Sequence, residues 1–452
     1  ERGMVEVFSA ATPVYAALDV RSADKKPPRY FPGYKMCNGL VVALENGKRF
    51  IFAFAEARSR KSGIYATFDA LPDPPLPGGC DDRADSTVVF RVSADDGHTW
   101  SRAAVVVKDD SAASYSDVVA GYHRSRKEIV LIMVRNHRQY VTTTLPLDAL
   151  RATAAASADN VAATPLFADV EFDEVTDITG LVHPAHLNAD RSAGVEDHPD
   201  GKCWLHKQRG GCAKYNASWA AFHARCPVTC GVVTPIATET YCNTGHTTTV
   251  YDDAADDLLF PASLGGKHRG VFLITKSKDG QWGVRGEQAL AYARVESTMQ
   301  LMEPAIAFDK QNNLLVVNCR SAILPGVSNF FAGNKRVELL SDDMGRTWRR
   351  NDDGGLQTSR TNLKEPWLTK GSTAGLASVR DEVLYVGTTS TWVRYGMSLF
   401  RRASDNNANY VHLKDLYRGN SMTENLLVDP EKDQVMGVLF EQGEPNRPLL
   451  GL

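Results

Sequence analysis

The 452-residue sequence has no uninterrupted apolar run of the roughly 18 to 20 residues that a membrane helix needs, so we expect no membrane span. It has no excess of basic residues either. Its 51 Lys and Arg stand against 54 Asp and Glu, and this net charge of −3 argues against nucleic acid as a partner. The paired CxxC spacings of structural zinc sites are also missing. We therefore expect a folded protein without a metal or other cofactor.

The cysteines are unevenly distributed. Five of the eight fall in one short stretch, which indicates a disulfide staple or a metal site: Cys203, Cys212, Cys226, Cys230 and Cys242. Nearby histidines keep zinc open as the alternative, but the spacing favours disulfides and hence an oxidising environment. The glycosylation sequon Asn216-Ala217-Ser218 agrees with this. We expect a secreted, extracellular or cell-surface glycoprotein.

Short apolar runs bounded by Gly, Asp, Asn or Pro predict an all-β protein. The runs are Gly39–Leu44, Arg49–Ala55, Ser86–Val92, Glu128–Val134, Val271–Thr275, Leu314–Asn318, Val383–Gly387 and Val435–Phe440. Two Ala-rich segments, Asp148–Ala158 and Ala217–Ala224, have a helical pattern, although the first could equally be a loop. Neither is expected in the core.

One eight-residue motif occurs twice, as Ser93–Trp100 and Ser341–Trp348, with the pattern S-x-D-x-G-x-T-W. It fits a hairpin turn, in which the Asp carboxylate accepts backbone N–H groups, the Gly takes a positive φ and the Trp ring is buried. Degenerate copies stand at Ser277–Trp282 and Ser404–Tyr410. Such recurrence between strands is typical of propeller blades or a solenoid, and the motif itself is structural.

These repeats resemble the Asp boxes of sialidases, and the segments around them are most similar to the trypanosomal sialidase and trans-sialidase group, from about Val5 to Gly443. The resemblance implies a six-bladed β-propeller with one small disulfide-rich insertion. It divides the chain into propeller over 1–195, insertion over 196–245 and propeller over 246–452. It also implies an exo-glycosidase that releases a terminal nonulosonic acid, such as sialic acid or its deaminated form, from sialylated or related acidic glycans.

The resemblance assigns site residues position by position. Phe54–Arg58 matches a family strand whose Arg lies in the sugar pocket, which makes Arg58 a candidate for binding the sugar. Glu303-Pro304 followed by Leu314–Arg320 matches the stretch with the catalytic Glu and a carboxylate-binding Arg. Trp392-Val393-Arg394 matches an aromatic platform followed by another such Arg. Arg suits this role because its planar fork pairs bidentately with a carboxylate.

The family's general acid lies about a dozen residues before the first Asp box, which points to Asp81 or Asp82 and less well to Asp85. A carboxylic acid there would protonate the leaving oxygen of the glycoside. Asp117 matches another pocket Asp, which contacts an N-acyl or hydroxyl substituent of the sugar.

Two positions depart from the family pattern. Lys35 stands where the family has the first Arg of its carboxylate-binding triad, so a point charge replaces a fork. Thr423, or Met422 with a shifted gap, stands where sialidases have their nucleophilic Tyr, and Tyr417 is the nearest tyrosine in sequence. These departures keep open an alternative function, a catalytically weak or inactive lectin that binds acidic sugars. A glycosidase for a different acidic sugar, and transfer instead of hydrolysis, also stay open.

The insertion resembles the ShK-type cysteine module of small toxins. That resemblance implies the pairs Cys203–Cys226 and Cys212–Cys230, and it leaves Cys242 free or with an unusual partner. Each bridge would stabilise the loop by roughly 2 to 4 kcal/mol. A staple for a long loop between blades is favoured over a binding role.

Overall fold

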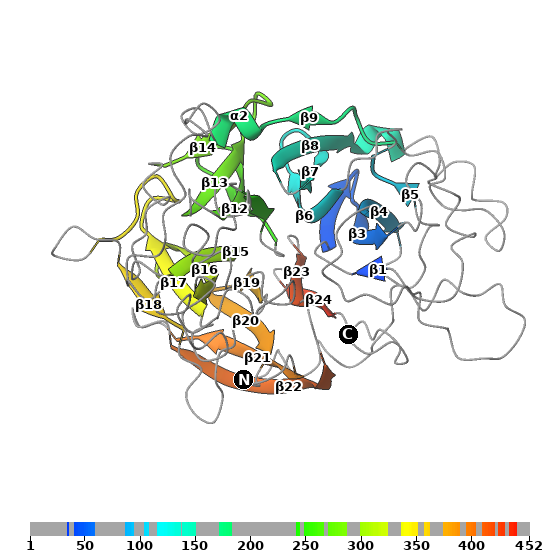
Figure 1. The fold of residues 1–452 in the computed structure, drawn as a ribbon. Coiled ribbons are helices and arrows are strands. Elements are labelled where there is room, and N and C mark those ends of the chain that lie inside the picture. The colour runs from blue at the N-terminus through cyan, green and yellow to red at the C-terminus, as the bar shows by residue number, and fades with distance from the viewer. Residues whose placement is uncertain are drawn as a thin grey trace, which may run out of the picture.

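Antiparallel sheets form a ring in the computed structural model (Figure 1). The residues that it describes are 34–35, 40–58, 86–94, 104–107, 115–136, 138–150, 171–182, 241–244, 248–265, 270–286, 299–323, 336–350, 357–361, 374–388, 395–403, 409–420, 424–429 and 434–440. Apart from strands they hold one 3-10 turn, Leu147–Leu150 (η3), and one short helix, Thr179–Val182 (α2). No helix in these ranges has the length and apolar character to cross a membrane.

The first three blades account for β1 to β14. The first contains β1 (Tyr34–Lys35), β2 (Leu40–Glu45), β3 (Lys48–Arg58), β4 (Ser86–Ser93) and β5 (Ala104–Val105). The second contains β6 (Tyr115–His123), β7 (Glu128–Arg135), β8 (Gln139–Pro146) and β9 (Thr176–Asp177). The third contains β10 (Tyr241–Thr244), β11 (Val250–Asp252), β12 (Asp257–Gly265), β13 (Gly270–Lys276) and β14 (Trp282–Arg285).

The rest of the ring is built from β15 to β24. The fourth blade contains β15 (Met299–Asp309), β16 (Leu314–Ile323), β17 (Arg336–Ser341) and β18 (Thr358–Arg360). The fifth contains β19 (Gly375–Val379), β20 (Glu382–Thr388), β21 (Tyr395–Arg402) and β22 (Tyr410–Asn420). A two-stranded sheet, β23 (Glu424–Asp429) with β24 (Gln434–Phe440), lies between β19 and β2, both of which contact β23.

The all-β propeller predicted from the sequence is confirmed, but the prediction of six blades is wrong for the described part of the chain. Five sheets have the four or five strands of a blade, and the sixth sheet has two. The reason is that a blade needs outer strands to cover its inner pair, and none pairs with β23 and β24 in the described ranges. The two strands still close the ring by packing between the last blade and the first.

The described residues of all eight apolar runs named above lie in strands, among them β2, β3, β4, β7 and β13; Gly39, the first residue of one run, is outside the described ranges. The segment 148–158 begins in η3, and its later residues are outside the described ranges, as are 217–224 and the cysteines at 203–230. The domain division therefore stays a prediction. Strand β10 belongs to the third blade although it falls in the range predicted for the insertion.

The hydrophobic core lies between neighbouring blades. One buried cluster joins the first and second blades through side chains such as Phe54 and Leu131, and a second joins the second and third through Tyr140 and Phe260. Two further clusters join the third blade to the fourth and the fourth to the fifth. Blade packing of this kind holds the inner strands at fixed distances around the axis.

The second copy of the repeated motif forms the expected turn. Asp343 Oδ1 accepts a hydrogen bond from the Thr347 backbone N–H at 2.8 Å, and Gly345 has a φ of +84°. The Trp348 ring is buried in the cluster between the third and fourth blades. The motif therefore stabilises a hairpin end and packs two blades together, which is the structural role predicted for it.

Two buried ion-pair networks also connect blades. Arg402 of the fifth blade donates to Glu338 of the fourth at 2.7 Å, and the Tyr410 hydroxyl donates to the other oxygen of Glu338 at 2.7 Å. Between the third and fourth blades, Asp252 accepts from Arg285 and, at 3.2 Å, from Arg346. Apart from Arg346, whose side chain is 51% exposed, these charges are buried with partners, which removes the cost that an unpaired buried charge would carry.

Candidate functional site

The strands that line the ring axis are interrupted in four blades. In the first blade β1 ends at Lys35 and β2 begins at Leu40, and both pair with β3. In the third blade β10 and β11 are separated in the same way along β12. In β6 and β15 the interruption is a β-bulge with one extra residue. Bulges re-aim side chains and occur next to active sites, so these four interruptions are candidate positions for a functional site.

The two bulges place carboxylates in the same strained backbone conformation. Asp117 begins the bulge of β6 with a φ of 47°, and Glu303 begins that of β15 with a φ of 46°. A residue with a side chain loses about 1 to 3 kcal/mol in this left-handed region, and such strain concentrates at functional sites. Pro304 follows Glu303 and has no N–H to give to the ladder, which suits a bulge. Both side chains are buried.

A single side chain connects these bulges. Asn243, at the end of β10, donates from Nδ2 to Asp117 Oδ2 at 3.3 Å. Its Oδ1 accepts the backbone N–H of Glu303, also at 3.3 Å. Both distances are at the long end of the hydrogen-bond range. Thr244 next to it donates to the backbone carbonyl of Asp117, so the second, third and fourth blades meet here through polar contacts.

Glu303 forms an ion pair with an arginine of its own blade. Arg320 of β16 donates from Nη1 to Glu303 Oε1 at 2.8 Å. The Nε of Arg320 is buried and makes no hydrogen bond within the described residues, so this guanidinium has a donor available for another acceptor. We call Asp117, Asn243, Glu303 and Arg320 the bridged cluster.

The buried side chain of Arg336 stabilises the backbone next to the bridged cluster. Its side chain is fully buried, and it donates to the backbone carbonyls of Asn318 at 2.6 Å and Glu303 at 3.4 Å. It also donates to the Asn318 side chain, which in turn donates to Thr361 Oγ1 at 2.7 Å. The bulge of β15 is therefore held by a buried cation in the same blade.

Tyr140 holds β10 from the second blade. Its hydroxyl accepts the Asn243 backbone N–H at 3.2 Å and lies 3.1 Å from the Asn243 carbonyl oxygen. Burial raises the pKa of Tyr140 well above its ordinary value, and burial likewise raises the pKa of the neighbouring Cys242 thiol. Burial raises the pKa of Cys319, which precedes Arg320, to about 12. Cys242 and Cys319 are both free, as the sequence left open for Cys242.

The structure brings together three of the predicted site residues, Asp117, Glu303 and Arg320. Lys35 and Arg58 lie at the same end of the first blade, because Lys35 pairs with Glu56, two residues before Arg58. Tyr417 is on β22, the outermost strand of its blade, where it pairs with Met397. Asp81, Asp82, Asp85, Trp392, Arg394, Met422 and Thr423 lie outside the described residues, although Thr423 immediately precedes β23 and Arg394 immediately precedes β21.

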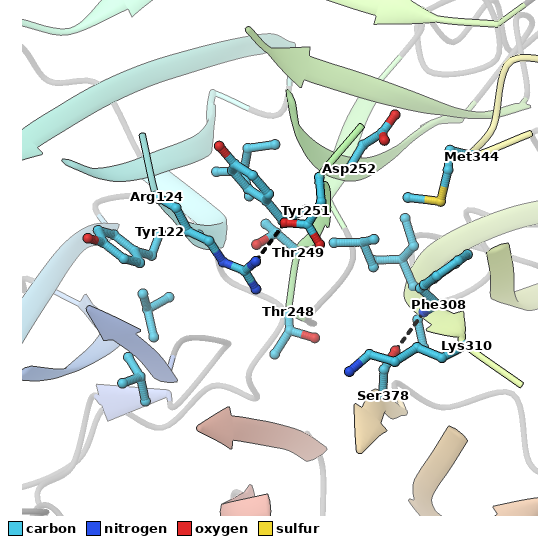
Figure 2. Close-up of a pocket in the computed structure, with 18 of the residues that line it drawn as sticks. Tyr122, Arg124, Thr248, Thr249, Tyr251, Asp252, Phe308, Lys310, Met344 and Ser378 are labelled. Carbon is cyan, nitrogen blue, oxygen red and sulfur yellow. Dashed lines mark hydrogen bonds and ion pairs between the residues drawn. The ribbon is translucent and has the colours of Figure 1, made fainter. Parts of the chain in front are cut away.

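A cavity of about 600 Å³ lies among the inner strands (Figure 2), and its lining includes residues that follow the two bulges along β6 and β15. Side chains from five inner strands line it, including Val41, Tyr122, Tyr251, Phe308 and Ser378. Its polar groups are largely occupied: Arg124 pairs with Asp253 at 2.7 Å, and the Ser378 hydroxyl accepts the Phe308 N–H at 2.7 Å. The cavity contains none of the residues of the bridged cluster.

Sequence reasoning missed Asn243 and Arg336. Asn243 follows a cysteine in the segment assigned to the insertion, and no repeat marks it. The apolar run 258–264 was the signal that could have located Asn243. This run forms the second strand of its blade, so an inner strand has to precede it in the sequence. Arg336 stands directly before the run Val337–Leu340 and has no distinguishing pattern.

No family model matches the chain, and no curated protein sequence matches it. Solved structures do. The Hadza microbial sialidase Hz136 aligns with 93% of this chain and 65% of its own, at 15% identity and a TM-score of 0.54. The fold is that of the sialidase β-propellers. Trypanosoma rangeli sialidase in complex with 2,3-difluorosialic acid aligns at 15% identity over 94% of this chain, with a TM-score of 0.53.

The same T. rangeli sialidase in complex with 2,3-difluoro-KDN has a TM-score of 0.52 and 15% identity over 94% of this chain. The chain spans 65% of the Hadza sialidase and 54% of the T. rangeli chains. At these identities the likeness establishes the fold, and any chemistry depends on the residues of the bridged cluster.

Proposed function

We propose that this chain is an exo-glycosidase of the sialidase type, which removes a terminal nonulosonic acid such as sialic acid or its deaminated form from a glycan. The observation that carries the proposal is the bridged cluster. Two carboxylates from different blades stand at strained bulges, and the guanidinium beside one of them has a buried donor without a partner among the described residues. The solved neighbours with this fold include sialidase complexes with difluorinated sialic acid and KDN.

The chemistry follows from the residue types. Arg320, with Arg394 and Lys35, would hold the sugar carboxylate, because guanidinium groups bind a planar anion through paired charge-assisted hydrogen bonds. Asp117 would accept a hydrogen bond from a substituent of the sugar. Asp81 or Asp82 would protonate the leaving oxygen as the glycosidic bond breaks, and Glu303 would support the nucleophile that attacks the anomeric carbon.

A second function is favoured by one feature, the position of the nearest tyrosine. Tyr417 lies on β22, the outermost strand of its blade, and the three strands β19, β20 and β21 lie between it and the axis. Thr423 is a weak nucleophile because an alkoxide is harder to form than a phenolate, whose parent hydroxyl has a pKa of about 10. We therefore keep as the alternative a lectin that binds an acidic sugar without cleaving it.

Binding and turnover separate the two functions. We would measure calorimetric binding of N-acetylneuraminate, its deaminated form and a neutral hexose, and hydrolysis of a fluorogenic sialoside, for the wild type and Glu303→Gln. Glu338→Gln is the matched control, since it changes a buried carboxyl of the same blade that contacts Arg402 and Tyr410 instead of the bridged cluster.

Turnover that is lost in Glu303→Gln and kept in Glu338→Gln supports the glycosidase. Binding of the two acidic sugars without turnover supports the lectin. Equal affinity for all three sugars, or binding of none of them, overturns the acidic-sugar site.

A further inference from the structure

We propose that Asn243 is a positioning residue of the acidic-sugar site, which keeps the Asp117 carboxylate and the Glu303 backbone at a fixed separation across three blades. The inference rests on the proposed function, because it requires Asp117 and Glu303 to face the sugar. It adds a residue that the resemblance to sialidases did not supply.

The hydrogen bonds determine how the carboxamide is oriented. The Glu303 backbone N–H can only donate, so the group 3.3 Å from it must be the oxygen of Asn243. The amide nitrogen then faces Asp117 Oδ2, also at 3.3 Å, and an ionised carboxylate can only accept. One short side chain therefore satisfies a donor of the fourth blade and an acceptor of the second.

Asn243 is itself held in place. Only 5% of the residue is exposed, and the Tyr140 hydroxyl accepts its backbone N–H at 3.2 Å. Ser263 donates to its carbonyl oxygen at 3.4 Å from the adjacent strand β12. Since both sides of its backbone are engaged, a displacement of Asn243 would break buried hydrogen bonds, each expensive to leave unmade. The bridge therefore transmits the packing of the second blade to the bulge of the fourth.

Asparagine is the residue type that this position requires. A leucine would remove both hydrogen bonds. An aspartate has nearly the same shape and could still accept the Glu303 N–H, but it would place a second carboxylate against that of Asp117. Of two carboxyl groups so close, one takes up a proton more easily, and the protonated group can again donate to the other.

The other titratable and charged groups around Asn243 set the conditions for such a test. Glu303 of the fourth blade and Asp117 and Tyr140 of the second hydrogen-bond with Asn243 directly. Arg320 and Arg336 contact Glu303, and Cys242, which precedes Asn243 on β10, interacts electrostatically with Asp177. Burial raises the pKa of Tyr140 and of Cys242, so both stay neutral from acid to mildly alkaline pH. Changes between pH 5 and 7.5 then report on the carboxyl groups.

The experiment compares wild type, Asn243→Asp and the control Glu338→Gln by calorimetric binding of N-acetylneuraminate from pH 5 to 7.5. We expect Asn243→Asp to bind about tenfold more weakly or worse at pH 7.5, and to recover most of this loss, relative to wild type, at pH 5. Glu338→Gln should lose stability but keep the wild-type affinity at both pH values. A loss that is the same at all pH values, or no loss, overturns the proposal.

A second pair of measurements does not need a ligand. In amide hydrogen exchange, the Glu303 N–H should exchange faster in Asn243→Leu than in wild type, while Asn243→Asp should keep most of its protection because its oxygen still accepts. Unchanged exchange in Asn243→Leu overturns the bridge. If Asn243→Asp does not fold, Tyr140→Phe replaces it in the binding measurement, because this variant removes the acceptor of the Asn243 N–H. Binding of N-acetylneuraminate that is severalfold weaker in Tyr140→Phe, with the wild-type affinity kept in Glu338→Gln, supports the proposal. If wild type binds none of the sugars, the proposed function fails, and the exchange result alone decides whether Asn243 positions Glu303.

Discussion

The pairing of Glu303 with Arg320 is the part of the site whose strength can be worked out from the structure. The two side chains are 9% and 17% exposed, and the atoms that join them are 2.8 Å apart. Opposite unit charges about 4 Å apart attract by about 4 kcal/mol at the effective dielectric constant of about 20 that suits such partly buried pairs. Since residual water contact weakens this attraction, we expect a coupling energy of about 2 to 4 kcal/mol.

A double-mutant cycle measures this coupling. Glu303→Gln and Arg320→Met are made singly and together, and the free energy of unfolding in urea is measured for all four proteins. Removal of one member of a buried pair typically costs about 3 to 5 kcal/mol, whereas removal of both costs much less than the sum. We expect the double variant to be more stable than additivity predicts by the coupling energy above.

An exposed ion pair supplies the control cycle. Arg124 and Asp253 are 2.7 Å apart, but their side chains are 49% and 77% exposed. Their coupling should stay below about 1 kcal/mol. If the Glu303–Arg320 cycle gave additive losses within about 0.5 kcal/mol, the two side chains would not be coupled, and the charge arrangement of the bridged cluster would be refuted.

Three further predictions concern stability, each measured by urea unfolding. Burial raises the pKa of Asp252, but its hydrogen bond and charge contact with Arg285 outweigh this and lower it; its stabilisation is therefore present above the ordinary pKa and lost as the pH falls through the lowered one. Asp252→Asn should be less stable than wild type at pH 7, with the gap closing toward pH 2; a constant gap would contradict this. Burial lowers the pKa of His123, so the unfolded chain takes up this proton first; stability should fall as the pH drops below about 6.5, and His123→Gln should lessen that fall. Gly345→Ala should lose at least about 2 kcal/mol, since its φ is +84° and a Cβ would meet Leu273 at 2.3 Å, whereas Gly47→Ala, with a φ of +75° and open space, should lose about 1 kcal/mol; equal losses would argue against the packing of the turn.

Local patterns were enough to predict the strands and their turns. Runs such as Glu128–Val134 are apolar on both faces because neighbouring blades cover them on both sides. Such a run can be recognised as a strand from its own sequence. The motif Ser341–Trp348 makes its turn from its own hydrogen bonds, so its geometry followed from residue chemistry. Repetition of both signals predicted propeller blades or a solenoid, and the resemblance to sialidases implied the propeller. The number of blades did not follow, because it depends on how sheets close into a ring, which no single segment encodes.

Tertiary structure alone decided how the site is connected. The sequence named Glu303 and Arg320, which are close along one hairpin, and Asp117, but it contained no sign that Asn243 joins Asp117 to Glu303. Those residues are 126 and 60 positions away from Asn243, and they meet because inter-blade packing sets the distances between the inner strands. A hydrogen bond across three blades depends on those distances to within a few tenths of an ångström, whereas a sequence pattern records only which residues share a strand or a turn. The residue types were therefore determined locally, and their arrangement into a site was determined by the ring.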